Sequence, residues 1–321
     1  MILACYLIIM NILTFIVYGV DKHKAKKGKW RVPESTLILL AVLGGAPGAG
    51  IGMLVWHHKT RKPKFYITIP VLVFLQVAVY IFCLYQNYHL TVSSYDVDIG
   101  LKEDMTIVQI SDLHNQFFGL NQSALLNRIE ELSPDMIVVT GDVVDSFHTS
   151  YGIAYRFFEG ATKIAPVYYI TGNHEVRLSA KMDEFTAKLK SMGVNYIDDQ
   201  YIDFGDYILA GIADASLDSF DAYGPFDGTK PVIMLAHEPA YHSLYKSLGA
   251  DLVFTGHIHG GQIIIPGKGA LLSPEFEFFP DLYEGVHDFD GMKMVISRGL
   301  GNSAAPVRIN DYPEIVVVKV R

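Results

Sequence analysis

Residues 105–114 read MTIVQISDLH, in which a β-branched apolar run ends abruptly in Asp112 and His114. Such a run is typical of a buried strand, and the polar residues mark its carboxyl end. Apolar and helical segments alternate downstream, which predicts βαβ units and a buried sheet covered by helices. The expected strands are 105–110, 135–140, 166–170, 207–214, 231–237, 251–257, 293–299 and 314–320, and the expected helices are 123–132, 151–164, 179–192 and 241–248.

Most of these strands end in polar residues that are able to bind metal ions. Ligands of open α/β sheets bind beyond the carboxyl ends of the strands, so these distant residues are expected to converge. Each motif is weak alone: Asp-x-His is commonly a capped turn, and His237-Glu238 lacks the second histidine of a zinc-protease motif because Tyr241 stands there. Together, carboxylates, imidazoles and one amide without thiolates suit divalent ions. The candidate ligands are Asp112, His114, Asp142, Asn173, His237, His257 and His259.

In order and spacing, these motifs resemble those of the calcineurin-like metallophosphoesterase family over roughly residues 103–321. The quoted blocks are Asp112-x-His114, Gly141-Asp142, Gly172-Asn173-His174-Glu175, His237 and Gly256-His257-x-His259. The ending SRGLGNSAAPVRINDYPEIVVVKV further resembles a membrane-associated branch of that family. The resemblance implies an α/β fold, an αββα sandwich.

The resemblance also implies a site with two divalent ions, whose identity among Mn, Fe and Zn stays open. Asp112, His114 and His259 would hold one ion, Asn173, His237 and His257 the other, and Asp142 would bridge both. The implied reaction is hydrolysis of a phosphodiester or related phosphoester by a metal-bridging hydroxide. His174 would act near the leaving group, with a purely structural role as its alternative. Arg308 would hold a second phosphate or an acidic headgroup, unless it forms a surface salt bridge.

Charge and hydropathy divide the 321 residues into two unlike parts. Residues 1–89 carry ten Lys or Arg and two acidic residues, a net +8, whereas the remainder carries 16 basic and 32 acidic residues, a net −16. The acidity argues against nucleic acid as the main substrate and favours a small or lipid-linked phosphoester. The mean hydropathy of +0.24 and three uncharged runs, 1–20, 36–56 and 65–88, indicate a membrane segment. We therefore expect a membrane unit over 1–89, a linker over 90–104 and the enzyme domain over 105–321.

The basic loops 22–31 and 57–64 are both expected to stay in the cytoplasm. The middle apolar run contains LGGAPGAGIG (43–52), which breaks an ordinary helix, so it is expected to dip into the membrane and return. That topology places the enzyme domain outside the cytoplasm of a multi-pass membrane protein. If the middle run crosses instead, the enzyme faces the cytoplasm. The glycine-rich run lacks the ending of a phosphate-binding P-loop, which argues against a nucleotide site.

Other functions stay open at this point. The arrangement over roughly residues 15–85 resembles a family of small bacterial membrane proteins of unknown function. One alternative to an enzyme is a membrane-tethered sensory or binding module whose phosphoesterase site is vestigial. Another is that the basic N-terminal unit is the functional part and binds anionic lipid or a partner, with the enzyme attached to it. The aromatic residues Phe276, Phe278, Phe279 and Tyr283 would either contact acyl chains or pack under a long loop. Oligomeric state is not indicated.

Overall fold

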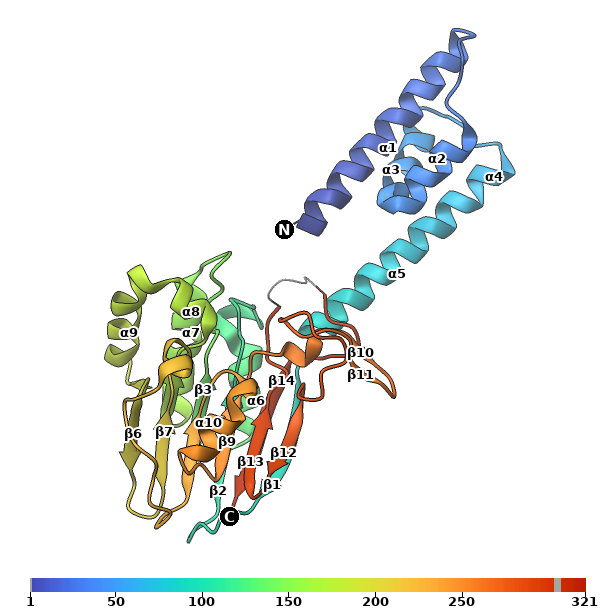
Figure 1. Cartoon of the computed structure of the whole chain (residues 1–321). Helices are drawn as coiled ribbons and strands as arrows, with labels where there is room; N and C mark the ends of the chain where they lie inside the picture. Colours follow the sequence, from blue (N-terminus) through green and yellow to red (C-terminus); the bar gives the residue numbers. More distant parts are fainter. Residues whose placement is uncertain (1, 303–306) are drawn as a thin grey trace. The chain divides into compact units, whose positions relative to one another are not determined.

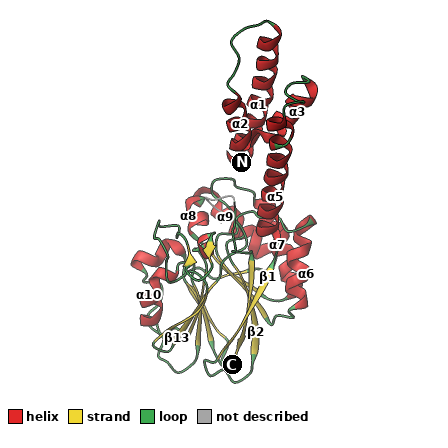
Figure 2. Ribbon diagram, turned by 90° about the vertical axis from the view of Figure 1, so that its right-hand side faces the viewer, coloured by secondary structure: helices red, strands yellow, loops and turns green. Residues whose placement is uncertain are grey.

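The computed structural model describes residues 2–302 and 307–321, and the chain divides into two compact units, Met1–Tyr85 and Gln86–Arg321. The C-terminal unit consists of two six-stranded mixed sheets that lie face to face, with helices on their outer faces (Figures 1 and 2). The expected αββα sandwich is therefore confirmed.

The first sheet has the order β1-β14-β2-β3-β4-β5, in which β14 is antiparallel to β2 and the other pairs are parallel. Its strands are β1 (Thr91–Val97), β2 (Met105–Ile110), β3 (Met136–Thr140), β4 (Val167–Ile170), β5 (Asn195–Tyr196) and β14 (Glu314–Val320). The second sheet has the order β12-β13-β9-β8-β7-β6, with antiparallel pairs at its two edges. Its strands are β6 (Gln200–Asp203), β7 (Ile208–Gly211), β8 (Val232–Leu235), β9 (Leu252–Thr255), β12 (Gly285–Phe289) and β13 (Met292–Ile296).

Apolar side chains fill the space between the sheets, where Ile107 and Val138 of the first sheet share a core with Leu235, Phe254 and Val295 of the second. The central strands are buried on both faces because helices cover the outer faces, which explains their continuous apolar sequences. Three helices pack on the first sheet and one on the second. These are α6 (Ser123–Glu131), α7 (Tyr151–Ile164) and α9 (Met182–Ser191), and α10 (His242–Ser247).

Part of the segment that we expected to be a linker belongs to the sheet. β1 pairs with β14 along its whole length, from Thr91 opposite Glu314 to Val97 opposite Val320. Its sequence, TVSSYDV, has no continuous apolar run because an edge strand has one neighbour and keeps several side chains partly exposed. The expectation of a linker over 90–104 is therefore wrong for Thr91–Val97, and β5, β6 and β12 escaped prediction for similar reasons of length and exposure.

In the N-terminal unit, the middle apolar segment forms a helical hairpin, residues 34–55. Its elements are α2 (Glu34–Leu40), a short π-helical turn (Ala41–Gly45) and α3 (Ala46–Val55), which lie beside α1 (Ile2–Lys26) and precede α4 (Pro63–Tyr66) and α5 (Thr68–Tyr88). The chain reverses at Gly44, whose φ of 107° is left-handed and suits glycine alone. Both ends of the hairpin return to Asp21 of α1, whose carboxylate accepts the Val32 N–H at 2.9 Å and lies 2.7 Å from His58 Nε2.

Polar side chains of α1 satisfy the backbone groups that the reversal leaves unpaired. Tyr6 Oη donates to the Leu43 carbonyl at 2.7 Å, and Asn11 Nδ2 donates to the Gly44 carbonyl at 3.0 Å. Asn11 Oδ1 accepts the Gly48 N–H at 2.7 Å, and a Cβ at Gly48 would collide with the Asn11 backbone. The glycine-rich run therefore serves a sharp turn and close helix packing. Three helical segments, Cys5–Lys26, Glu34–Val55 and Pro63–Tyr88, are long and apolar enough to cross a membrane.

Candidate metal centre

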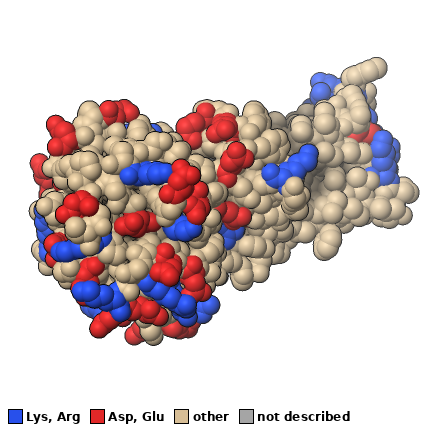
Figure 3. All heavy atoms as spheres, turned by 60° about the horizontal axis from the view of Figure 1, so that its bottom comes forward, with Lys and Arg blue, Asp and Glu red and all other residues tan. Residues whose placement is uncertain are grey.

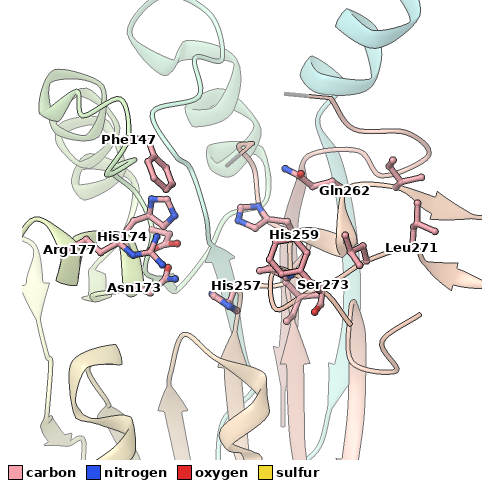
Figure 4. A pocket seen from close by; sticks show the side chains of 16 residues that line it. Phe147, Asn173, His174, Arg177, His257, His259, Gln262, Leu271 and Ser273 are labelled. Carbon is pink, nitrogen blue, oxygen red and sulfur yellow. The ribbon is translucent and has the colours of Figure 1, made fainter. Parts of the chain in front are cut away.

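The loops after β2, β3, β4, β8 and β9 bring the seven expected ligands to one edge of the sandwich. All are buried except Asn173, which is partly exposed. Figure 4 shows His174 and Asn173 on one side of the site, with His257 and His259 facing them.

Three overlapping groups of donor side chains form the centre. Asp112, His114 and His259 form one group and Asp142, His237 and His257 a second, with potential ligand atoms within 4.8 Å of one another in each. The first group holds the three residues expected at one ion, and the second holds His237 and His257 of the other together with Asp142; Asn173 belongs to neither group. A third group, His114, Asp142 and His174, lies between them. Asp142 Oδ2 lies 3.5 Å from His114 Nε2 and 3.4 Å from His237 Nε2, so this carboxylate is close to one histidine of each expected ion site.

The backbone of the site is unusual. Asp112, His114, Asp142, His257 and His259 all have positive φ, between 42° and 68°. Left-handed backbone is uncommon for residues other than glycine and costs free energy that the surrounding structure must offset. Five of the seven expected ligands share it, which indicates that the loops are shaped to aim these side chains inward.

Charge in the site is unbalanced without added cations. Burial would raise the pKa of Asp142, but attraction to His237 and a hydrogen bond from it hold that pKa well below its ordinary value. Asp142 in turn raises the pKa of His237 despite burial, whereas burial lowers the pKa of His114 to about 3. In the metal-free protein a proton on His237 thus balances the carboxylate, a role that a divalent ion would take over.

The positions of the donor atoms fit metal ions. His114 Nε2 lies 3.1 Å from His259 Nε2, and His257 Nδ1 lies 3.3 Å from His237 Nε2. The Thr140 carbonyl lies 2.7 Å from His237 Nδ1, and because a carbonyl only accepts, that nitrogen carries a hydrogen and Nε2 is left to ligate. The buried Asn173 Oδ1 has no hydrogen-bond partner among the described residues. Imidazole nitrogens that face each other and a buried amide oxygen without a protein partner fit cations held among them.

Glu175, which we did not assign a role from the sequence, holds the ligand loops together. Its fully buried carboxylate accepts N–H groups of Asp142 at 2.7 Å, Val144 at 2.9 Å and Gly172 at 3.0 Å. Burial, and next the charge of Asp142, raise its pKa to about 8. Half of a capping box was present in the sequence, since a Glu at the third helical position can accept the N–H of the residue before the helix, here Gly172, although glycine offers no side chain in return.

His174 lies at the first turn of α8 (Asn173–Arg177), and its backbone N–H donates to Asp142 Oδ1 at 2.8 Å. The Ser146 N–H donates to His174 Nδ1 at 3.1 Å, and Asp145 Oδ1 lies 3.6 Å from the same nitrogen. A neutral His174 ring therefore carries its hydrogen on Nε2. Because His174 also belongs to the third donor group, its role stays a prediction.

Arg308 occupies neither of the positions that we expected. Its side chain is fully buried, and its guanidinium donates to Asp311 at 3.0 Å, to Asn302 at 3.1 Å and to the carbonyls of Arg298 and Gly301 at 2.9 and 2.6 Å. It is therefore committed to internal partners and forms no surface salt bridge. The sequence did not reveal this because the buried acceptors belong to residues 298, 301, 302 and 311, which lie outside the strands and helices.

A cavity of about 380 Å³ opens beside the donor groups. Asn173, His174 and Arg177 line one side, and Arg177 is the one Arg or Lys among the described lining residues. It stands four residues after Asn173 on α8, a spacing that could have revealed it. The other side is apolar and is formed by Ile258, Ile263, Leu271, Leu272, Pro274 and Phe276.

The aromatic residues of the loop after the last ligand block are exposed. The exposed fractions are 79% for Phe276, 69% for Phe278 and 44% for Phe279, and Tyr283 is partly buried. Packing under a long loop, one of the two alternatives for these residues, is therefore wrong for the three phenylalanines. Glu275 of the same loop lies 2.6 Å from His257 Nε2, which ties the loop to the donor groups.

Comparison with known protein families gives two matches. The family described as "Calcineurin-like phosphoesterase" matches residues 105–261, and the family described as "Protein of unknown function (DUF1294)" matches residues 11–65. Both resemblances stated from the sequence are confirmed.

Individual relatives divide in the same way. An uncharacterized metallophosphoesterase of Campylobacter jejuni is 28% identical over 72% of this chain, which spans 63% of that protein. The phosphodiesterase YaeI of Escherichia coli is 24% identical over 67% of this chain and 81% of its own length. The uncharacterized protein YsdA of Bacillus subtilis is 40% identical over 25% of this chain and 93% of its own length.

Proposed function

The chain belongs to the calcineurin-like metallophosphoesterase family through residues 105–261, joined to an N-terminal DUF1294 unit, and we propose that it is a membrane-anchored hydrolase of phosphodiesters that requires two divalent ions. The observation that carries the proposal is the convergence of two three-residue donor groups, one of which contributes Asp142, whose carboxylate also lies 3.5 Å from His114 of the other. The similarity to the phosphodiesterase YaeI supports a diester over a monoester.

We assign Asp112, His114 and His259 to one ion, Asn173, His237 and His257 to the other, and Asp142 to both. When bound, the ions would neutralise phosphate oxygens and lower the pKa of an attacking water. His174 stands at the cavity wall with its Nε2–H as the donor. As a neutral ring it would donate a hydrogen bond to the departing oxygen, and as an imidazolium it would give that oxygen a proton and become neutral. Arg177 replaces Arg308 as the residue that binds a phosphate oxygen of the substrate.

The apolar side of the cavity supports a lipid-linked substrate. Six apolar residues line the cavity together with donor side chains, and Phe276 among them is exposed. A phosphoester with an acyl or isoprenoid chain would place its phosphate at the ions and its chain on this wall. A water-soluble diester would leave the wall in contact with water.

Activity of the full-length protein in neutral detergent tests the proposal. We expect turnover of bis(p-nitrophenyl) phosphate with Mn²⁺ added and none after chelation, with a phospholipid substrate and p-nitrophenyl phosphate run in parallel. Arg177→Ala should raise KM, with Lys181→Ala, a substitution outside the cavity lining, as its control. Absence of turnover with every metal would favour the alternative of a binding module with a vestigial site.

The lipid-linked substrate has its own test. Phe276→Ser should lower kcat/KM for a phospholipid about tenfold while sparing the chromogenic diester. Phe278→Ser is the matched control, because Phe278 is similarly exposed in the same loop but does not line the cavity. Equal effects of both substitutions on both substrates would count against binding of a chain on this wall.

We also propose that the hairpin dips into the membrane and returns, so that the enzyme domain lies outside the cytoplasm. The tip of the hairpin bonds to Asn11 of α1, and its two ends bond to Asp21, ten residues further along the same helix. Ten helical residues span about 15 Å, which is half of the ~30 Å thickness of the hydrocarbon core, so the hairpin reaches about halfway across the membrane. Both basic loops then lie on one side, and α5 leads to the other. Reporter fusions after Lys26 and Lys62 should be cytoplasmic and one after Arg321 exported; a cytoplasmic signal after Arg321 would overturn this topology.

A further inference from the structure

The N-terminal unit contains a cavity of about 340 Å³ that is lined by cations, which we call the basic pocket. It lies where α1 ends, the hairpin begins and ends, and α4 begins. In Figure 3, blue Lys and Arg side chains gather at the far end of this unit, with little red among them. The polar lining residues are Lys22, Lys26, Arg31, His58, Lys59 and Lys62.

A buried ionic network fixes the wall of the basic pocket. The carboxylate of Asp21 is fully buried and binds Arg31 at 3.0 Å and His58 at 2.7 Å. Lys59, whose side chain is 2% exposed, lies 2.8 Å from Glu34 and 3.7 Å from Asp21. These side chains come from three separate segments, so the cations of the wall are held in place before any ligand arrives.

The charge of the basic pocket is not balanced within the unit. Asp21 and Glu34 are the sole acidic residues in positions 1–85, and both are already engaged by the network. Lys22 donates to the His57 carbonyl, and among the described residues neither Lys22 nor Lys26 pairs with a carboxylate. Five Lys or Arg thus share two carboxylates around one cavity, an arrangement that favours an anion.

The position of the basic pocket specifies the kind of anion. It lies at the ends of apolar helices, beside exposed apolar side chains such as Leu54 and Ile67. Trp30 and Trp56, both exposed, lie one and two residues in the sequence from the lining residues Arg31 and His58, and tryptophan is enriched at membrane interfaces. We propose that the basic pocket binds the phosphate group of an anionic phospholipid whose acyl chains lie along the helices.

The two tryptophans of the chain, Trp30 and Trp56, provide the assay, since each lies within two residues of a lining residue in the sequence. Tryptophan fluorescence of the full-length protein is measured in bilayers of phosphatidylcholine and phosphatidylglycerol. Brominated forms of either lipid quench this fluorescence, and a comparison of the two gives the preference of the protein for the anionic lipid. We expect the wild type to prefer phosphatidylglycerol and Lys22→Gln/Lys26→Gln to lose about tenfold of that preference. The single change Lys26→Glu, at an exposed side chain, should act in the same direction without touching the network.

Lys24→Gln/Lys27→Gln is the matched control, because it removes the same charge from the same end of α1 outside the basic pocket. It should change the preference by less than about threefold. Equal losses in both double variants would overturn the proposal in favour of diffuse attraction. Millimolar inorganic phosphate should leave the preference intact; if it abolishes the preference, the pocket takes free phosphate rather than lipid. The readout is independent of turnover, so it stands or fails separately from the proposed hydrolase activity.

Discussion

The substitution Gly172→Ala tests how closely the backbone approaches the central carboxylate of the metal centre. A Cβ at Gly172 would lie 2.8 Å from the Asp142 backbone nitrogen and 2.9 Å from His237 Cε1, and closer still to Asp142 Oδ1. The φ of −105° and ψ of −174° at Gly172 suit alanine, so the substitution introduces a collision without backbone strain.

The size of the effect follows from these distances. Ordinary Cβ contacts begin near 3.4 Å, so Asp142 and His237 must each retreat by roughly half an ångström or more. Displacements approaching 1 Å cost about 10²-fold in rate when they move catalytic groups, and overpacking costs about 1–3 kcal/mol in stability. We therefore expect kcat/KM to fall about 10²-fold, with the protein still folded.

The assay is kcat/KM for bis(p-nitrophenyl) phosphate at saturating Mn²⁺, with bound metal measured in parallel. Gly152→Ala is the control, because no heavy atom of a non-neighbouring residue lies within 4 Å of a Cβ there and the position is helical. Alanine should leave the activity of that variant unchanged and its stability equal or higher by about 1 kcal/mol. A Gly172→Ala protein with normal metal content and kcat/KM within about threefold of wild type would refute the reasoning.

Three further substitutions test single roles. Asp142→Asn should cost more turnover than any other single ligand change, because its carboxylate lies within 3.5 Å of His114 at one proposed ion and of His237 at the other, and normal turnover with two bound metals would exclude it as the bridging ligand. His174→Ala should lower turnover about 10²- to 10⁴-fold with nearly unchanged metal content, and loss of a metal equivalent would make His174 a ligand. Asp311→Ala should lower the free energy of unfolding by about 3–5 kcal/mol, because it leaves the buried Arg308 unpaired, and a melting temperature within about 2 °C of wild type would contradict this.

The sequence by itself determined which chemical groups the metal centre contains. Asp112, Asp142 and His237 were identifiable because each follows a run whose apolar sequence marks it as a buried strand, and the ends of such strands meet at one edge. The turn at the glycine-rich run was also predictable, since five glycines and a proline in ten residues oppose a continuous helix. These signals are local, and a local signal is readable without knowing what packs against it.

The tertiary structure decided what depends on partners far apart in the chain. β1 could be assigned only through its pairing with β14, more than 200 residues away, because an edge strand needs no apolar run. Arg308 resembled a surface or substrate-binding cation until its buried acceptors were located, whereas Arg177 emerged because α8 directs it to the cavity. Likewise, the basic pocket exists because Asp21 gathers cations from three segments. The free energy of a charged or edge-strand residue is set by its spatial neighbours, and those neighbours are fixed by the fold rather than by adjacent sequence.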